Sequence, residues 1–305
     1  MKNNKYYIIS AFLILLLFPL TIFSYNKNKK ISILPSEPEH TKEVNLLDKN
    51  EIKKLKLEEY IVGVVACEMP ASFNEEALKA QSISARTYAL YKMDGSREYD
   101  LVSTKDDQCY ITQEEMKNKW KNGYTKYYNK VLEAVNSTKD KIMIYQGKPI
   151  KAFYFSTSNG YTEDVKNVFG EEIEYLVSVE SPNEEQTTHF NDNKTFTIKD
   201  FLSKLSIDAT LIKKIDILGY SKTNRVNEII VNDKKFKGTK FRQLLNLNST
   251  DFKITYDKNN IYINTVGYGH GVGMSQYGAN AMAIKGKTYE EILKHYYKNI
   301  IIKNV

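Results

Sequence analysis

The amino-acid sequence predicts an α+β fold, and three patterns support this class. Apolar residues in 57–65 recur at i, i+3, i+4 and i+7, the spacing of a helix with one buried face. A second helix is expected over 72–93, which opens with the capping-box sequence Ser-Phe-Asn-Glu, and an amphipathic one over 289–297. Between these helices, 130–180 has the pattern of short strands with polar turns. Helices at both ends and antiparallel strands between them define the α+β class.

A further stretch, at about 195–265, alternates helical and strand patterns and is predicted to be an inserted α/β subdomain. In its last part, two strand-like runs flank Asn259 and Asn260, which is typical of a β-hairpin. The strands expected in this stretch are 215–220, 226–231, 252–256 and 261–265.

The amino terminus carries a long apolar segment. Residues 6–25 hold no charge, and a helix of that length spans about 30 Å, the hydrocarbon thickness of a bilayer. A cleaved signal peptide is the alternative, but Ile22 stands where a cleavage site needs a small residue. We expect a transmembrane anchor at 1–25, a polar linker at 26–50 and one globular domain at 51–305. The lysines on the two sides of the segment do not decide its orientation.

Composition and charge exclude several functional classes. The chain of 305 residues has 44 Lys and Arg against 37 Asp and Glu, but residues 1–30 hold five lysines and no acid. The rest therefore carries a net charge of only +2 and has no basic run, which argues against nucleic acid as a partner. Two cysteines exclude a disulfide-built miniprotein and a four-cysteine zinc module.

One carboxylate occupies a position where the helical pattern expects a core residue. Glu68 follows Val64 by four residues and continues the apolar face, and Pro70 ends the helix just after it. Because burial disfavours the charged form, the pKa of Glu68 should be raised, as a general acid requires near neutral pH. The alternative is a structural salt bridge from Glu68 to Lys79 or Arg86, which share one face of the next helix.

Two polar segments further along the chain have the composition of a cleft wall. Residues 267–279 contain five glycines, with His270, Ser275 and Gln276 as the candidate binding residues. The spacing of a phosphate-binding loop is absent, and a tight structural turn is the alternative. Residues 154–160 are rich in hydroxyls, which contact sugar hydroxyls or only satisfy the turn. The candidates in this second segment are Tyr154, Ser156 and Thr157.

The two cysteines adjoin these motifs and leave three interpretations open. Cys67 precedes Glu68, and Cys109 lies in the segment Asp-Asp-Gln-Cys-Tyr. They are two unlinked core residues, a disulfide, or, completed by a histidine such as His270, the ligands of a zinc ion. A separation of their Cα atoms well above roughly 7 Å would exclude the disulfide.

Seven segments, taken together, are more specific than any one of them. They read EMPASFNEEALKAQSISARTYAL, DDQCY, FYFSTSNGYTED, YLVSV, FRQLL, GYGHGVGMSQYGANAMA and YEEILKHYY, within about 57–300. In this order they closely resemble the stage II sporulation protein D family, which shares its domain with amidase enhancers of the LytB type. The resemblance implies a membrane-anchored lytic transglycosylase that cuts peptidoglycan during engulfment of the forespore. It also implies that the domain lies outside the mother-cell membrane.

The resemblance further implies roles for individual residues. Glu68 matches the catalytic glutamate, and Lys79 and Arg86 match positions that line the site. We expect Arg86 to hold substrate or to orient the site. Gln108 and Tyr110, from the DDQCY match, join the candidate substrate-binding residues.

The chain departs from the family pattern at two residues. Cys67 stands where relatives usually carry another small residue, and Asn159 stands where the pattern more often has glycine. Asn tolerates the left-handed region, so the second change is expected to be mild.

These inferences lead to an enzymatic hypothesis and a rival. A hydrolase of the usual kind needs two carboxylates, whereas one suffices if the MurNAc 6-hydroxyl replaces water. Glu68 is the convincing acid, although Asp106 or Asp107 could supply a second, so we expect non-hydrolytic cleavage of the MurNAc–GlcNAc bond without a cofactor. The rival is a non-catalytic module of the LytB type that enhances a separate amidase. The expected partners are peptidoglycan glycan strands, a companion amidase and engulfment membrane proteins.

Overall fold

The computed structural model describes residues 42–104 and 106–305. The expected anchor and most of the expected linker lie outside them. Within the described residues, no helix is long and apolar enough to cross a membrane. The domain begins earlier than expected, because Glu43–Asp48 form a strand whose alternate residues are buried. The linker predicted for 26–50 therefore ends before this strand.

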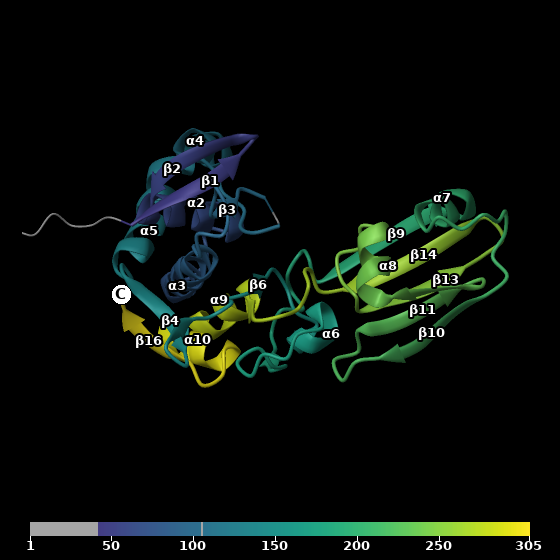
Figure 1. Ribbon diagram of the computed structural model, residues 1–305. Helices are drawn as coiled ribbons and strands as arrows, with labels where there is room; N and C mark the ends of the chain where they lie inside the picture. The colour runs from purple at the N-terminus through teal and green to yellow at the C-terminus, as the bar shows by residue number, and fades with distance from the viewer. Residues whose placement is uncertain (1–41, 105) are drawn as a thin grey trace, which may run out of the picture. The chain divides into compact units, whose positions relative to one another are not determined.

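Helices form the centre of the main part of the domain (Figure 1). α2 (Leu57–Glu68) packs against α3 (Glu75–Lys92), and three later helices also contact α3, namely α5 (Tyr124–Asn136), α9 (Gln276–Ile284) and α10 (Tyr289–Tyr296). α3 is buried at twelve of its eighteen residues, because its alanines and serines let neighbouring elements approach closely. The three predicted helices are confirmed as α2, α3 and α10.

The start of α3 differs in detail from the prediction. The Asn74 side chain accepts a hydrogen bond from the Glu76 backbone N–H at 3.0 Å and caps the helix. The expected cap, Ser72, lies two residues further from the helix. The capping residue is therefore Asn74.

Short strands and helices surround this centre. Their bounds are β1 Glu43–Asp48, β2 Glu51–Lys56, β3 Leu101–Val102, α4 Gln113–Trp120, η1 Lys121–Gly123, β4 Lys141–Tyr145, β5 Lys148–Pro149, β6 Tyr154–Phe155, β7 Gly160–Tyr161, α6 Val165–Phe169, β8 Glu180–Ser181, β15 Met274–Ser275 and β16 Ile301–Asn304. They form the sheets β2–β1–β3 and β16–β4–β5 and the pairs β6–β15 and β7–β8. The parallel β6–β15 pair places the hydroxyl-rich segment beside the glycine-rich one.

The inserted part has a hydrophobic core of its own, built around Phe201, Phe241 and Phe252. Its sheets have the strand orders β10–β11–β12 and β13–β14–β9, and all pairs are antiparallel. The predicted hairpin and the predicted strands are confirmed, β10, β11 and β13 residue for residue. The bounds are β9 Asn191–Thr197, α7 Ile198–Lys204, β10 Ile215–Tyr220, β11 Val226–Val231, β12 Lys234–Lys237, α8 Gly238–Leu244, β13 Phe252–Tyr256 and β14 Asn260–Val266.

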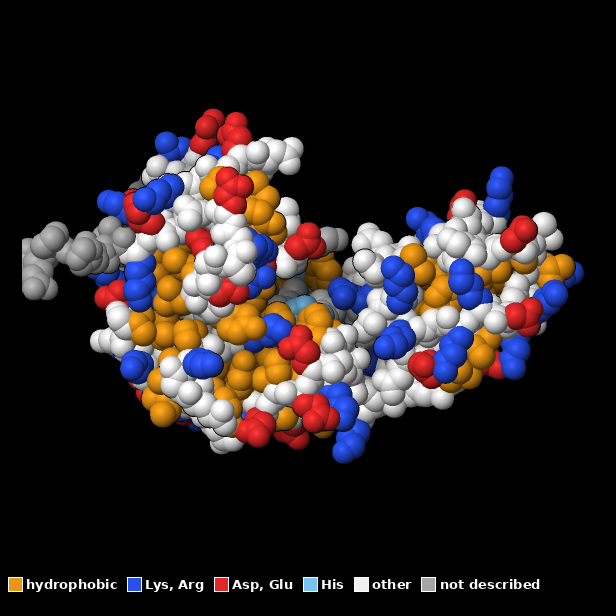
Figure 2. Space-filling view, viewed as in Figure 1, with side chains coloured by type: hydrophobic (Ala, Val, Ile, Leu, Met, Phe, Trp, Pro, Cys, Tyr) orange, Lys and Arg blue, Asp and Glu red, His pale blue; other side chains and the backbone are white. Residues whose placement is uncertain are grey.

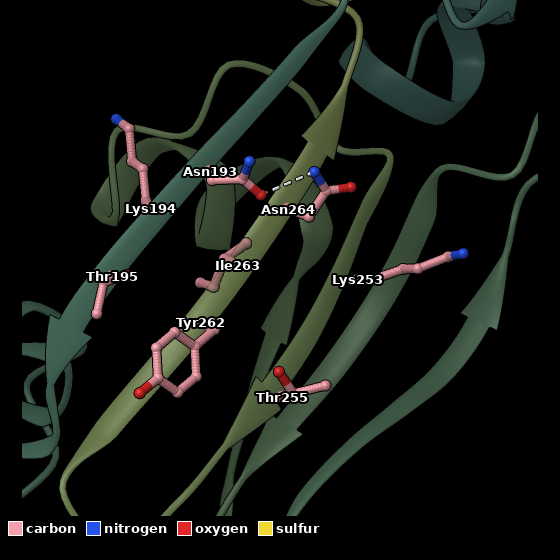
Figure 3. Close-up of a pocket in the computed structure, with 8 residues that line it drawn as sticks. All are labelled: Asn193, Lys194, Thr195, Lys253, Thr255, Tyr262, Ile263 and Asn264. Carbon is pink, nitrogen blue, oxygen red and sulfur yellow. Dashed lines mark hydrogen bonds between the residues drawn. The ribbon is translucent and has the colours of Figure 1, made fainter.

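One face of the β13–β14–β9 sheet bears exposed polar side chains around a hollow of about 380 Å³ (Figure 3). Asn264 Nδ2 on β14 donates a hydrogen bond to Asn193 Oδ1 on the neighbouring strand β9 at 2.9 Å. Residues 191–266 hold fourteen Lys and Arg against eight Asp and Glu, and basic side chains are prominent on the visible face of this part (Figure 2). The inserted part is therefore basic.

Candidate functional site

The end of α2 places a carboxylate at the edge of the helical core. Met69, held extended before Pro70 and almost fully buried, stops the helix directly after Glu68. Lys119 of α4 donates hydrogen bonds to the carbonyls of Ala66 and Cys67, at 2.8 and 3.3 Å. These are last-turn carbonyls without a partner in the helix, so Lys119 caps α2 from a neighbouring helix.

Glu68 is largely buried and is held by groups from three other segments. Its Oε1 accepts a hydrogen bond from the Cys109 backbone N–H at 2.7 Å. The side chains of Gln276 and Tyr154 lie close to this carboxyl group and stabilise its charged form. Burial raises the pKa of Glu68, while the Cys109 amide and the charge of Lys119 partly offset the increase. The predicted direction of the pKa shift is confirmed.

A buried chain of hydrogen bonds positions the phenol beside Glu68. Tyr60 donates to Gln108 Oε1 at 3.0 Å, and Gln108 Nε2 donates to the Tyr154 hydroxyl oxygen at 3.1 Å. Gln108 Nε2 also donates to the Ala85 carbonyl at 3.3 Å. Burial, and then the nearby Glu68, raise the pKa of Tyr154 well above 10, so its phenol stays neutral. Of the predicted site residues, Gln108 and Tyr154 therefore belong to the surroundings of Glu68.

The glycine-rich segment contributes Gln276 to the site. Gln276 begins α9 and is almost fully buried, and its Nε2 donates to Gln81 Oε1 on α3 at 3.4 Å. Ser275 instead caps α9, since its Oγ accepts from the Gly278 N–H at 3.2 Å. Of these two neighbours, Gln276 is the one that contacts Glu68.

A second buried carboxylate, Glu184, was missed by the sequence analysis. It accepts hydrogen bonds from the Ser158 N–H and from the hydroxyls of Ser158, Ser181 and Ser275, at 2.7 to 2.8 Å. Burial raises its pKa, and the bond from Ser275 is the largest opposing contribution. Glu184 ties the hydroxyl-rich segment to the start of α9, so these serines hold the loops together. A single Glu in a polar loop gives no sequence signal for this role.

His270 lies in an aromatic pocket. Its ring is 5.6 to 5.8 Å from those of Phe153, Phe155 and Phe169, and its Nδ1 accepts from the Val272 N–H at 3.0 Å. Burial, and then the charge of Arg242, lower the pKa of His270 to about 4. The imidazole is therefore neutral and supports the glycine-rich turn.

The polar groups of the hydroxyl-rich turn, residues 154–160, form hydrogen bonds with other residues of the protein. Thr157 is buried and exchanges backbone hydrogen bonds with Tyr268, and its Oγ1 lies 3.1 Å from Ser156 Oγ. The departure at Asn159 is mild for a reason other than the expected one. The left-handed conformation falls on Gly160, at φ 103°, and Asn159 Nδ2 donates to the Thr223 carbonyl at 2.7 Å.

The structure pairs Arg86 and Lys79 with carboxylates other than Glu68. Arg86 is fully buried, and its guanidinium donates to both oxygens of Glu58 at 2.7 and 2.6 Å. Lys79 pairs with Glu75 and Glu76 at 2.6 and 3.0 Å. The alternative interpretation was a salt bridge from one of these cations to Glu68. Both cations do form salt bridges, but with Glu58, Glu75 and Glu76. Both cations lie on one side of α3, as predicted, but the neighbours on that side are not the end of α2.

Tyr110 packs on α2 before the end that carries Glu68. Its ring stacks on Tyr60 with centroids 5.7 Å apart and fills the space left by Gly63, where a Cβ would lie 2.2 Å from the ring. Tyr110 therefore supports the helix, and none of its contacts is with Glu68.

The structure selects the disulfide among the three interpretations of the cysteines. Cys67 and Cys109 are bonded, with their Cα atoms 5.7 Å apart. Disulfide sulfurs have no thiolate to offer a metal, and His270 lies in its aromatic pocket. Within residues 42–104 and 106–305, no group of three His, Cys, Asp or Glu side chains is arranged to hold a metal ion.

Asp106 and Asp107, the candidate second carboxylates, are bound by groups other than those around Glu68. Asp107 is bound by Lys92 at 2.8 Å, by the Tyr88 hydroxyl at 3.2 Å and by the Val102 N–H at 3.0 Å. Asp106 is exposed and bonds to Thr104. Neither has a contact with Glu68. At the end of α2 the α+β scaffold therefore places one partly buried acid, Glu68, beside a neutral phenol and an amide.

Comparison with known proteins identifies the family. Residues 47–145 match the family model described as "Stage II sporulation protein". The chain is 41% identical over 254 residues to stage II sporulation protein D of Bacillus subtilis strain 168, covering 81% of this chain and 74% of that protein. It is 39% identical over 260 residues to the protein of the same name from Bacillus amyloliquefaciens, covering 83% and 76%. The chain belongs to the stage II sporulation protein D family of sporulation proteins.

A more distant relative carries a different name. The amidase enhancer of Bacillus subtilis strain 168 is 29% identical over 292 residues, which cover 77% of this chain and 39% of that protein. The family match at 47–145 includes Glu68 and both cysteines.

Proposed function

We propose that this protein is a peptidoglycan lytic transglycosylase that cleaves the MurNAc–GlcNAc bond and acts in forespore engulfment. The observation that carries the proposal is Glu68, a largely buried carboxyl group with a raised pKa at the end of α2. A carboxyl group that keeps its proton near neutral pH is suited to protonate a glycosidic oxygen. Membership of a sporulation family supports sporulation as the setting of the proposed reaction.

The reaction needs a single carboxyl group. Glu68 gives its proton to the glycosidic oxygen as the bond from that oxygen to MurNAc C1 breaks. The MurNAc 6-hydroxyl oxygen then bonds to C1, and its proton returns to Glu68. The product is a 1,6-anhydroMurNAc end, and no water is consumed. The engagement of Asp107 with Lys92 and Tyr88 favours this route over hydrolysis with a second carboxylate.

The groups around Glu68 have separate tasks in this scheme. The neutral Tyr154 phenol and the Gln276 amide orient the carboxyl group, because each is itself fixed by a buried partner. Lys119 limits the rise in pKa, so that Glu68 can also act as a base after the first step. No cofactor takes part in the proposed chemistry.

The proposed location is the outer side of the mother-cell membrane, with the apolar segment 6–25 as the anchor. The disulfide Cys67–Cys109 supports an extracytoplasmic domain, because disulfides persist in oxidising compartments. The basic inserted part, 191–266, suits a wall polymer whose stem peptides carry carboxylates. A companion amidase and other engulfment membrane proteins are the proposed partners.

A second candidate function is a non-catalytic module that enhances a separate amidase. The relationship to the amidase enhancer of Bacillus subtilis favours it. On this alternative, the protein binds glycan strands and leaves their bonds intact.

Digestion of purified glycan strands by the full-length protein, with product masses recorded, separates these functions. Ends carrying 1,6-anhydroMurNAc support the transglycosylase, and reducing ends formed by water addition indicate a hydrolase. Glu68→Gln keeps the shape of the side chain and removes the proton, so it should bind glycan normally and lose essentially all cleavage. Glu290→Gln, at an exposed residue of α10, is the matched control and should cleave as the parent does. No cleavage by the parent, together with tight glycan binding, would favour the enhancer.

A further inference from the structure

The disulfide joins two cysteines that both adjoin the proposed acid, Glu68. Cys67 is the residue before Glu68, and its partner, Cys109, donates its backbone N–H to Glu68 Oε1 at 2.7 Å. One covalent bond therefore joins the end of α2 to the residue whose amide holds the carboxyl group. The two cysteines are 42 residues apart in sequence, so the bond closes a long loop.

The segment that carries Cys109 has no regular structure of its own. Residues 106–112 belong to neither a helix nor a strand, and the acceptor of the Cys109 N–H is a side chain. Neighbouring residues are anchored, since Gln108 bonds to Tyr60 and the Ile111 N–H to the Gly63 carbonyl at 3.4 Å. These contacts fix the segment onto the middle of α2 and not onto its last turn.

The other contact at the end of α2, made by Lys119, does not involve Cys109. Lys119 binds the carbonyls of Ala66 and Cys67, so it holds the helix end and not the opposing segment. The disulfide is thus the covalent link that keeps the Cys109 amide within hydrogen-bonding distance of Glu68.

We propose that the Cys67–Cys109 disulfide is a positioning clamp for Glu68, which holds the Cys109 amide against the carboxyl group and so fixes the direction of its proton. This inference rests on the proposed function of Glu68 as the general acid. Cys67 and Cys109 are positioning residues, because they act through Glu68 and contact no reacting atom. The clamp opens when a dithiol supplies two electrons and two protons: the S–S bond becomes two thiols, and the dithiol becomes a cyclic disulfide.

The test compares the oxidised full-length protein with Cys67→Ser, Cys109→Ser and the double variant, on purified glycan strands. A displaced acid should lower the cleavage rate about tenfold or more, with glycan affinity unchanged. The three variants should lose the same amount, because each breaks the same bond. Dithiothreitol should lower the parent to the level of the variants, and reoxidation should restore it. Dithiothreitol should leave the double variant unchanged.

A second measurement separates positioning from stability alone. The Cys109 amide stabilises the carboxylate and so lowers the pKa of Glu68. Opening the clamp should therefore raise that pKa, measured by ¹³C NMR titration with Glu68→Gln as the assignment control. The rates are taken well below the melting temperature of each variant. Equal rates and an equal Glu68 pKa in the parent and the double variant would overturn the clamp.

The two proposals fail in different ways. A parent that cuts no glycan contradicts the proposed function, whereas the NMR titration still reports whether the disulfide controls Glu68. A parent that cuts glycan, with a double variant that cuts it equally fast at the same Glu68 pKa, contradicts the clamp and leaves the function standing.

Discussion

Arg86 and Glu58 form a two-point ion pair across α3 and α2, with nitrogen–oxygen distances of 2.7 and 2.6 Å. Arg86 is fully buried, and the carbonyls of Lys141 and Val135 accept its remaining hydrogen bonds at 3.2 and 3.3 Å. The pair joins the first turn of α2 to the helix beside it. The cation that bears on Glu68, at the other end of α2, is Lys119.

This arrangement predicts that Arg86 contributes to stability and not to substrate binding. Arg86→Met leaves the Glu58 carboxylate partly buried without its cation, and should lower the free energy of unfolding by about 3 kcal/mol. Urea unfolding of the full-length protein measures this loss. Below the melting temperature of the variant, glycan affinity should equal that of the parent.

The matched control for this prediction removes both charges. Arg86→Met with Glu58→Leu should recover part of the lost stability, because an unpaired carboxylate costs more than a missing pair. If Arg86→Met keeps the parent's stability and loses glycan affinity, the residue holds substrate as its sequence position suggested.

The local features of the fold could be predicted from the sequence. The periodicity of α2, the proline after it and the small residues of α3 depend on neighbouring residues alone, so the end of α2 was placed correctly. The raised pKa of Glu68 followed from its place on an apolar face. β1 was missed because six residues after a polar stretch give a short alternation.

The tertiary partners could not be predicted. Helical spacing puts Lys79 and Arg86 on one face but does not say which element packs there. Lys119 lies in a polar helix and resembles an ordinary surface lysine until the fold brings it to the end of α2. Gln276 could be singled out by its motif, but its contact with Glu68 depends on the packing of α9 against α3.

His270 predicts a pH dependence of stability. Its pKa is about 4 in the folded protein, against an ordinary value near 6.5, so the unfolded chain binds the proton more readily. The neutral imidazole therefore contributes stability in full above about pH 6.5, and this contribution is lost as the pH falls towards 4. Between pH 7 and 4.5, the parent should lose about 2 kcal/mol more than His270→Asn.

Urea unfolding of both proteins at the two pH values gives this difference, because the carboxylates common to both cancel. The Asn side chain supplies an acceptor for the Val272 N–H in place of Nδ1. An equal loss in the two proteins would mean that His270 is protonated in the folded state.

Lys119 predicts a shift in the pH dependence of cleavage. Its charge lowers the pKa of Glu68, so Lys119→Met should raise that pKa further. A general acid works in its protonated form, and the rate falls as the pH rises through its pKa. The alkaline limb of kcat/KM should therefore move to higher pH in Lys119→Met. Lys119→Arg keeps the charge and should leave the limb near its parental position. A limb that moves to lower pH, or moves equally in both variants, would contradict the assignment of that limb to Glu68.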